Sequence, residues 1–93
     1  MALTAQCSAN GGEWRVYVVL LGEPEWPEFR WPRTAPVPTT AERQEALAAL
    51  GYESVPGSKW VWIEDCATPG DDRSAVWLIA RIDVRELPAG GAP

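Results

Sequence analysis

A segment of seventeen residues, 22–38, constrains the fold of this chain more than any other, because five of its residues are proline. A proline has no backbone N–H and disfavours helical geometry in the residue before it. We therefore expect no helix or strand here, but a long loop that separates two structured regions. The loop also carries Trp26, Phe29 and Trp31. Such a loop either folds as a lid on the domain's own sheet or projects as an aromatic arm toward a partner.

Before the loop, the pattern predicts a β-hairpin. The stretch LTAQCSA, residues 3–9, alternates apolar and polar side chains with the two-residue period of a strand. Asn10-Gly11 follows, a pair that favours the positive φ angles of a tight turn. Residues 13–21 then read EWRVYVVLL, a run rich in β-branched and aromatic side chains that is typical of a strand.

After the loop, residues 40–50 carry the pattern of a helix. Thr39 and Glu42 have the spacing of a capping box, and Gly51 is placed for a left-handed C-terminal cap. Arg43 lies beside a narrow apolar stripe, which consists of Ala46, Leu47, Ala49 and Leu50. A helix of this length covers one face of a small sheet, so the other face needs a different cover.

Two further strands are predicted at residues 59–65 and 73–87. The element order is then ββαββ, and we expect one α+β domain over residues 1–87 with a flexible tail at 88–93. The economical packing is a four-stranded antiparallel sheet with one helix on one face and the long Pro/Trp-rich loop. The second and fourth strands are the most continuously apolar, so we place them in the centre, which predicts the strand order 1-2-4-3.

The register of the last hairpin decides where its tryptophans point. Trp60 and Trp62, in KWVWIEDC, lie two residues apart and project from the same face of a strand. If Asp65 pairs with Ser74, this is the face away from the helix, and Trp62 meets Trp77 there. A shift of one residue turns both indoles under the helix instead. In either register, apolar side chains remain on the outer face near the middle of this hairpin.

An uncovered aromatic face of this kind predicts a binding surface. The Pro/Trp-rich loop, a second copy of the chain, or a different partner or ligand could each cover it. Tryptophan is a frequent centre of binding energy in protein interfaces. The candidate binding residues are the aromatic side chains of the loop and of the last hairpin, namely Trp26, Phe29, Trp31, Trp60, Trp62 and Trp77.

Composition argues against catalysis, cofactors and metals. The chain has no His, which is the commonest general base and metal ligand, and no phosphate-binding or nucleophile motif. Glu64, Asp65, Asp71 and Asp72 flank one turn, but their spacing matches no calcium loop, so we expect them to be solvated. The net charge of −5 disfavours nucleic acid and favours basic protein surfaces as partners.

The N-terminal stretch MALTAQCSANGG lacks the basic and apolar regions of a signal peptide. The longest apolar run, VYVVLL, is too short to cross a membrane. We therefore expect a cytoplasmic protein that does not bind membranes. In that compartment Cys7 and Cys66 are expected to be reduced, buried, small apolar side chains.

The stretch EALAALGYESVPGSKWVWIEDCATPGDDRSAVWLIARIDVR resembles a family of short, acidic, uncharacterised proteins from streptomycetes and related actinobacteria. The resemblance includes WRVYVVLLGEPEWPE and so covers most of the chain. Its specific parts are the helix followed by Gly and an aromatic residue, PGxxWxW and TPGDDRS. It implies a cytoplasmic, actinobacterial setting and transfers no catalytic or binding residue.

The function predicted on these grounds is that of a non-catalytic protein-interaction module. It would be an accessory or regulatory protein that binds another protein, or a second copy, through its aromatic sheet face and its acidic Pro/Trp-rich loop. The alternative is a small-molecule or carbohydrate-binding domain that stacks its ligand on Trp60, Trp62 or Trp77. A pocket closed by the loop would favour the ligand, and a flat apolar face would favour the partner.

Overall fold

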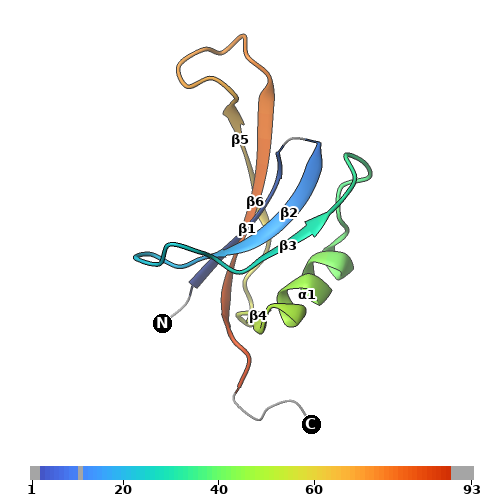
Figure 1. The fold of residues 1–93 in the computed structure, drawn as a ribbon, viewed down its shortest axis with the longest axis vertical. Coiled ribbons are helices and arrows are strands. Elements are labelled where there is room, and N and C mark those ends of the chain that lie inside the picture. The colour runs from blue at the N-terminus through green and yellow to red at the C-terminus, as the bar shows by residue number, and fades with distance from the viewer. Residues whose placement is uncertain (1–2, 11, 89–93) are drawn as a thin grey trace.

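The computed structural model of this chain describes residues 3–10 and 12–88, which form one antiparallel sheet and one helix (Figure 1). The strands lie in the order β3-β2-β1-β6-β4, with β5 also paired to β6, and the sheet curves into a half-barrel. In chain order, the elements are β1 (Leu3–Asn10), β2 (Glu13–Val19), β3 (Glu28–Trp31), α1 (Thr40–Ala49), β4 (Tyr52–Ser54), β5 (Val61–Cys66) and β6 (Val76–Glu86).

The predicted first hairpin is confirmed. Ala5 and Cys7 of β1 stand opposite Val18 and Val16 of β2, and all four side chains are buried. The positive φ angle of the turn lies at Gly12, at 83°, and no residue other than glycine has a positive φ in the part of the chain that the structure describes. Asn10 therefore does not supply the predicted left-handed angle, and Gly11 lies outside the described residues.

The predicted helix and its capping box are also confirmed. The Thr39 hydroxyl accepts a hydrogen bond from the Glu42 backbone N–H at 3.1 Å, and the Glu42 carboxylate accepts one from the Thr39 N–H at 2.9 Å. Gly51 follows the helix with a φ of 92°, as a left-handed cap requires. Helix α1 packs against β2 and β4 and buries Ala46 and Leu47 on the concave face of the sheet.

The predicted four-stranded sheet with the order 1-2-4-3 is wrong. Strand β1 lies between β2 and β6, so the first strand rather than the second is central. Its small side chains, Ala5 and Cys7, leave room on the concave face for larger ones from the neighbouring strands. Strand β2 is apolar because it too has a strand on each side. Strand β3 pairs with the edge of β2 that faces away from β1, and Trp31 of β3 stands opposite Trp14 there.

The prediction that residues 22–38 contain no regular structure is also wrong, because Glu28–Trp31 forms strand β3. Prolines at 27 and 32 flank this strand without entering it. An edge strand needs ladder hydrogen bonds on one side only, so four residues between two prolines are sufficient.

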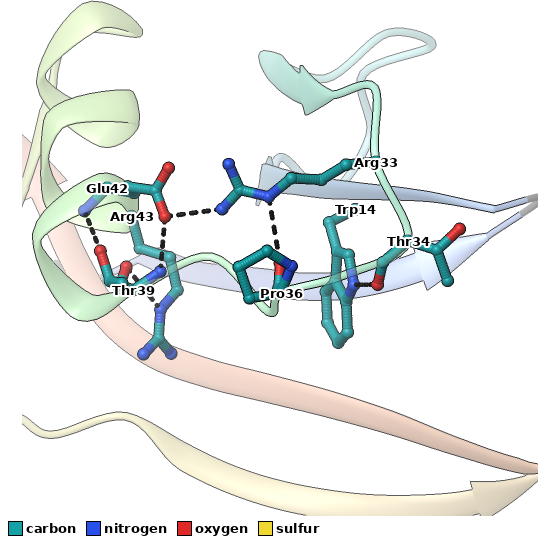
Figure 2. A network of polar contacts seen from close by, with 7 residues as sticks. All are labelled: Trp14, Arg33, Thr34, Pro36, Thr39, Glu42 and Arg43. Carbon is teal, nitrogen blue, oxygen red and sulfur yellow. Dashed lines mark hydrogen bonds and ion pairs between the residues drawn. The ribbon is translucent and has the colours of Figure 1, made fainter.

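The residues that follow β3 are held against β2 and α1 by side-chain hydrogen bonds (Figure 2). The Trp14 indole N–H donates to the Thr34 carbonyl at 2.8 Å. The Arg33 guanidinium donates to the Pro36 carbonyl at 3.0 Å and to the Glu42 carboxylate at 2.6 Å. This half of the predicted loop is therefore fastened on the helix side, neither a lid on the far face nor a projecting arm.

Strands β4 and β5 lie one after the other along the same edge of β6. Ser54 pairs with Val84, and Val61 pairs with Arg81. Between the two strands the chain makes a turn, in which the Ser58 hydroxyl donates to the Val55 carbonyl at 2.6 Å. The three-residue strand β4 was not predicted.

The last hairpin has a register that differs from the one in which Asp65 pairs with Ser74. Ile63 stands opposite Ile79, three residues further along β6 than that register would place it. An odd shift exchanges the two faces, as the predicted one-residue slip would. Trp62 therefore stands opposite the buried Ala80, on the helix side. There its ring meets the Trp14 ring edge to face, with 6.1 Å between the centroids.

No helix in residues 3–10 and 12–88 is long and apolar enough to span a membrane. The predicted flexible tail, 88–93, lies outside the described residues except for Pro88.

Candidate functional site

The β5–β6 hairpin extends beyond the rest of the sheet (Figure 1). Strand β1 pairs with β6 only as far as Ile79. Among the described strands, residues 76–78 of β6 therefore pair with β5 alone. The turn that joins the two strands, residues 67–75, lies at the far end. We call residues 61–78 the arm.

Both faces of the arm carry exposed apolar side chains, each between 40% and 61% exposed. An antiparallel sheet normally buries one face and hydrates the other, so a strand pair that is apolar on both faces is a candidate binding surface. The cross-strand register places three of these side chains on the face away from α1, namely Val61, Ile63 and Trp77. It places three on the helix side, namely Trp62, Val76 and Leu78.

The outer face of the main sheet is polar, in contrast to the arm. The Tyr17 hydroxyl donates to the Gln6 side chain at 2.8 Å, and Arg15 forms an ion pair with Glu28 at 3.3 Å. The pKa of Glu28 is lowered by its hydrogen bond from Arg30 and by the charge of Arg15. The apolar outer surface that was predicted near the middle of the last hairpin is confirmed there, on Val61, Ile63 and Trp77.

The arm is strongly acidic. It holds four carboxylates against one guanidinium, that of Arg73, which leaves a net charge of −3 on residues 61–78. The carboxylates belong to Glu64, Asp65, Asp71 and Asp72. Two of the four accept hydrogen bonds from the backbone: Asp71 from the Arg73 N–H at 3.0 Å and Asp65 from the Cys66 N–H at 2.8 Å. No group of three or more potential metal ligands exists in the described residues.

Arg43 of α1 lies at the base of the arm, against the indoles of Trp60, which directly precedes the arm, and Trp62, which belongs to it. The guanidinium carbon is 4.6 Å from the Trp60 ring centroid and 5.5 Å from that of Trp62. Arg43 is only 6% exposed, and burial lowers its pKa. Cys7 lies close enough for the positive charge of Arg43 to act on its thiol, but burial dominates and raises the Cys7 pKa to about 11.

The predicted hairpin tryptophans therefore separate into two groups. Trp60 and Trp62 lie together beside Arg43 on the helix side, and Trp60 is packed against the core. Trp77 lies on the opposite face of the arm, which it shares with Ile63.

The three aromatic residues of segment 22–38 lie elsewhere. Trp26 stacks on Tyr17 on the outer face, with centroids 6.0 Å apart and 22° between the planes, and its N–H donates to the Leu20 carbonyl at 2.8 Å. Trp31 is buried in the core, and the Phe29 ring lies 5.0 Å from it. Only Trp26 acts as the predicted cover of the outer face, and it covers Tyr17 rather than the arm.

Sequence reasoning missed Arg43 and the aliphatic side chains of the arm. The signal for Arg43 was its spacing, because residues 43, 46, 47 and 50 occupy the i, i+3, i+4, i+7 positions of one helix face. The signal for the arm was a pair of continuous apolar runs, VWI and AVWL, on the two sides of one turn. Because consecutive residues of a strand point to opposite faces, such runs place apolar side chains on both faces. The two cysteines are free thiols, with Cys7 buried and Cys66 partly exposed at the end of β5.

Comparison with known proteins finds one family model that covers nearly the whole chain. The model describes a family of unknown function, DUF6303, and matches residues 1–92. No curated protein and no solved structure matches the chain.

Proposed function

We propose that this chain, which belongs to the DUF6303 family, is a non-catalytic interaction protein that inserts its β5–β6 arm into a groove on another protein. The observation that carries this proposal is the exposure of six large apolar side chains on the two faces of one strand pair. The role would be accessory or regulatory. The resemblance to streptomycete proteins supports an actinobacterial, cytoplasmic setting as part of the proposal.

The shape of the arm favours a groove over a flat partner surface. A flat surface would cover Trp77 and its neighbours and leave Trp62 and Leu78 in water, or the reverse. A groove, or a site between two elements, covers both faces together. Strand β5 also has an edge that pairs with no other strand in the described residues, so a partner strand could add to it.

The charge of the arm favours a different protein over a second copy of this chain. Two arms side by side would bring their net charges of −3 together, and the whole chain carries −5. Like charges across an interface oppose association. We therefore propose a partner whose apolar groove is bordered by Lys or Arg side chains.

The test is affinity capture from lysate of the native host, combined with reconstitution of the captured pair from purified components. The arm variant is Trp77→Ser/Leu78→Ser. The matched control is Trp26→Ser, because Trp26 is 42% exposed, close to the 49% of Trp77, but lies off the arm. We expect the arm variant to stay folded and to bind at least about 30-fold more weakly, as loss of an interface hot spot does. The control should bind like the wild type.

Two results would contradict the proposal. One is a partner that the arm variant retains at wild-type affinity. The other is a wild-type protein that light scattering shows to be a dimer and that the arm substitutions turn into a monomer, because a second copy would then occupy the arm. Affinity for the partner should also fall as salt rises, since the proposed attraction is electrostatic at the rim of the groove.

A ligand-binding role is the second candidate, and one observation favours it. Trp60 and Trp62 border a cavity of about 420 Å³, within the size range of small-molecule sites. Stacking of a ligand on an indole there would need Trp62, which is exposed on one side.

A further inference from the structure

Arg43 is a buried cation without an acidic partner. Its side chain extends away from the neighbouring Glu42, which pairs with Arg33 instead (Figure 2). None of the ion pairs in the described part of the chain includes Arg43. The nearby Cys7 thiol does not supply the missing negative charge at neutral pH, because burial raises its pKa to about 11. A buried charge is normally compensated by an opposite charge or by a full set of hydrogen bonds.

The hydrogen bonds of Arg43 are incomplete as well. Its Nε donates to the Thr39 carbonyl at 3.3 Å, and its Nη2 donates to the Thr40 hydroxyl at 3.1 Å. Its Nη1 has no acceptor in the residues that the structure describes, and neither has the indole N–H of Trp60, whose ring lies against the guanidinium. Two buried donors without acceptors therefore lie on two side chains in contact.

The adjacent cavity of about 420 Å³ has the opposite charge to the rest of the chain. Arg43 and Lys59 both line it, and no Asp or Glu is among its lining residues, although the chain as a whole carries −5. Trp62 and Ile82 provide an apolar wall. The cavity thus has two cationic side chains and an apolar wall, and the two unpaired donors belong to its lining residues Arg43 and Trp60, which are the elements of a site for an organic anion.

We propose that this cavity binds a small organic carboxylate, whose oxygens accept hydrogen bonds from Arg43 Nη1 and the Trp60 indole and whose apolar body lies on Trp62. Solvent does not reach Nη1 or the Trp60 N–H directly. The proposal therefore requires a rotation of Trp62, whose ring centroid lies 5.5 Å from the guanidinium carbon and whose side chain is 40% exposed on an edge strand. Lys59 attracts the anion at the entrance. This inference rests on the ligand-binding candidate above, and because the site shares Trp62 with the arm, its test uses the chain without a partner.

Benzoate and its uncharged analogue benzamide are suitable probes, because they have nearly the same shape and differ in charge. Titration calorimetry on the wild-type chain should show saturable benzoate binding, with benzamide at least about tenfold weaker. Lys59→Met should weaken benzoate by about threefold, and Arg43→Met should abolish saturable binding up to about 10 mM. The matched control is Arg30→Met, which removes one positive charge from an exposed site and should bind like the wild type.

Trp60→Phe provides a second variant that keeps the ring and removes only the indole N–H. It should weaken benzoate by about threefold to tenfold, which is informative even if Arg43→Met fails to fold. Three results would overturn the proposal: no saturable benzoate binding by the wild type up to about 10 mM, equal affinity for benzoate and benzamide, or wild-type benzoate affinity in the folded Arg43→Met or Trp60→Phe chain.

Discussion

Substitution of Trp31 by Ala tests whether the proline-rich segment is part of the folded core. Trp31 lies in β3 opposite Trp14 and is only 8% exposed. A buried tryptophan hides roughly 150–250 Å², worth about 4–6 kcal/mol at about 25 cal/mol per Å². That figure is an upper bound, because the unfolded chain already buries part of the ring. Large core aromatics replaced by Ala lose about 3–5 kcal/mol, and we expect a loss in this range.

The assay is urea denaturation followed by far-ultraviolet circular dichroism, which does not depend on tryptophan emission. A loss of about 4 kcal/mol moves the midpoint by about 2 M at a typical denaturant slope. A domain of this size has a total stability of about 5–15 kcal/mol, so the variant would retain about 1–11 kcal/mol and its unfolding transition would remain measurable. Phe29→Ala is the matched control in the same strand. Phe29 is 37% exposed, so its loss should be only about 1–2 kcal/mol.

A loss below about 1 kcal/mol for Trp31→Ala would refute this reasoning. Residues 28–31 would then contribute no core, and segment 22–38 would be the unstructured loop that its prolines predict.

Three further predictions concern the helix cap and the two thiols. Thr39→Ala should lower stability by about 1 kcal/mol in urea, and an unchanged midpoint would contradict the capping box. The pKa of Glu42 is lowered to about 2, first by its hydrogen bond from Arg33. Because this value is below that of the unfolded chain, the stabilisation is complete at pH 7 and decreases as pH falls from about 4.5 toward 2. Glu42→Gln should remove that pH dependence between urea midpoints at pH 7 and pH 3, and an equal decrease in both proteins would count against it. Iodoacetamide at pH 8 should modify Cys66 but not buried Cys7 until the chain is unfolded, as peptide mass spectrometry would show, whereas equal labelling would mean that β1 opens readily.

Local patterns predicted the first hairpin and α1 correctly because their signals are complete within a few residues. The capping box of Thr39 and Glu42 and the alternation of β1 and β2 need no information from the rest of the chain. Strand order needs such information. Ala5 and Cys7 gave β1 a weak apolar signal, yet they occupy the centre of the sheet because neighbouring strands fill the space above them.

The candidate site was predicted in part. The six aromatic residues were identified from their types. Their positions depend on the register of the β5–β6 hairpin and on the curvature of the sheet, which bring Trp62 next to Trp14 and leave Trp77 on the other face. The cross-strand shift that decides this depends on the length of the turn at residues 67–75, which no local pattern specifies. Arg43 was missed because a charged helix residue is expected in solvent, whereas here the indoles of Trp60 and Trp62, distant in the sequence, lie over it.

The contact between Trp14 and Trp62 provides an intrinsic spectroscopic probe of the position of the β5–β6 hairpin. Trp14 belongs to β2 and Trp62 to β5, with β1 and β6 between them in the sheet, so their rings meet only because the sheet curls. Two indoles 6.1 Å apart and 80° from parallel couple their electronic transitions, and the coupling falls steeply with separation. The circular dichroism of this coupled pair would therefore change when the β5–β6 hairpin moves relative to the rest of the half-barrel, and the measurement needs no added label.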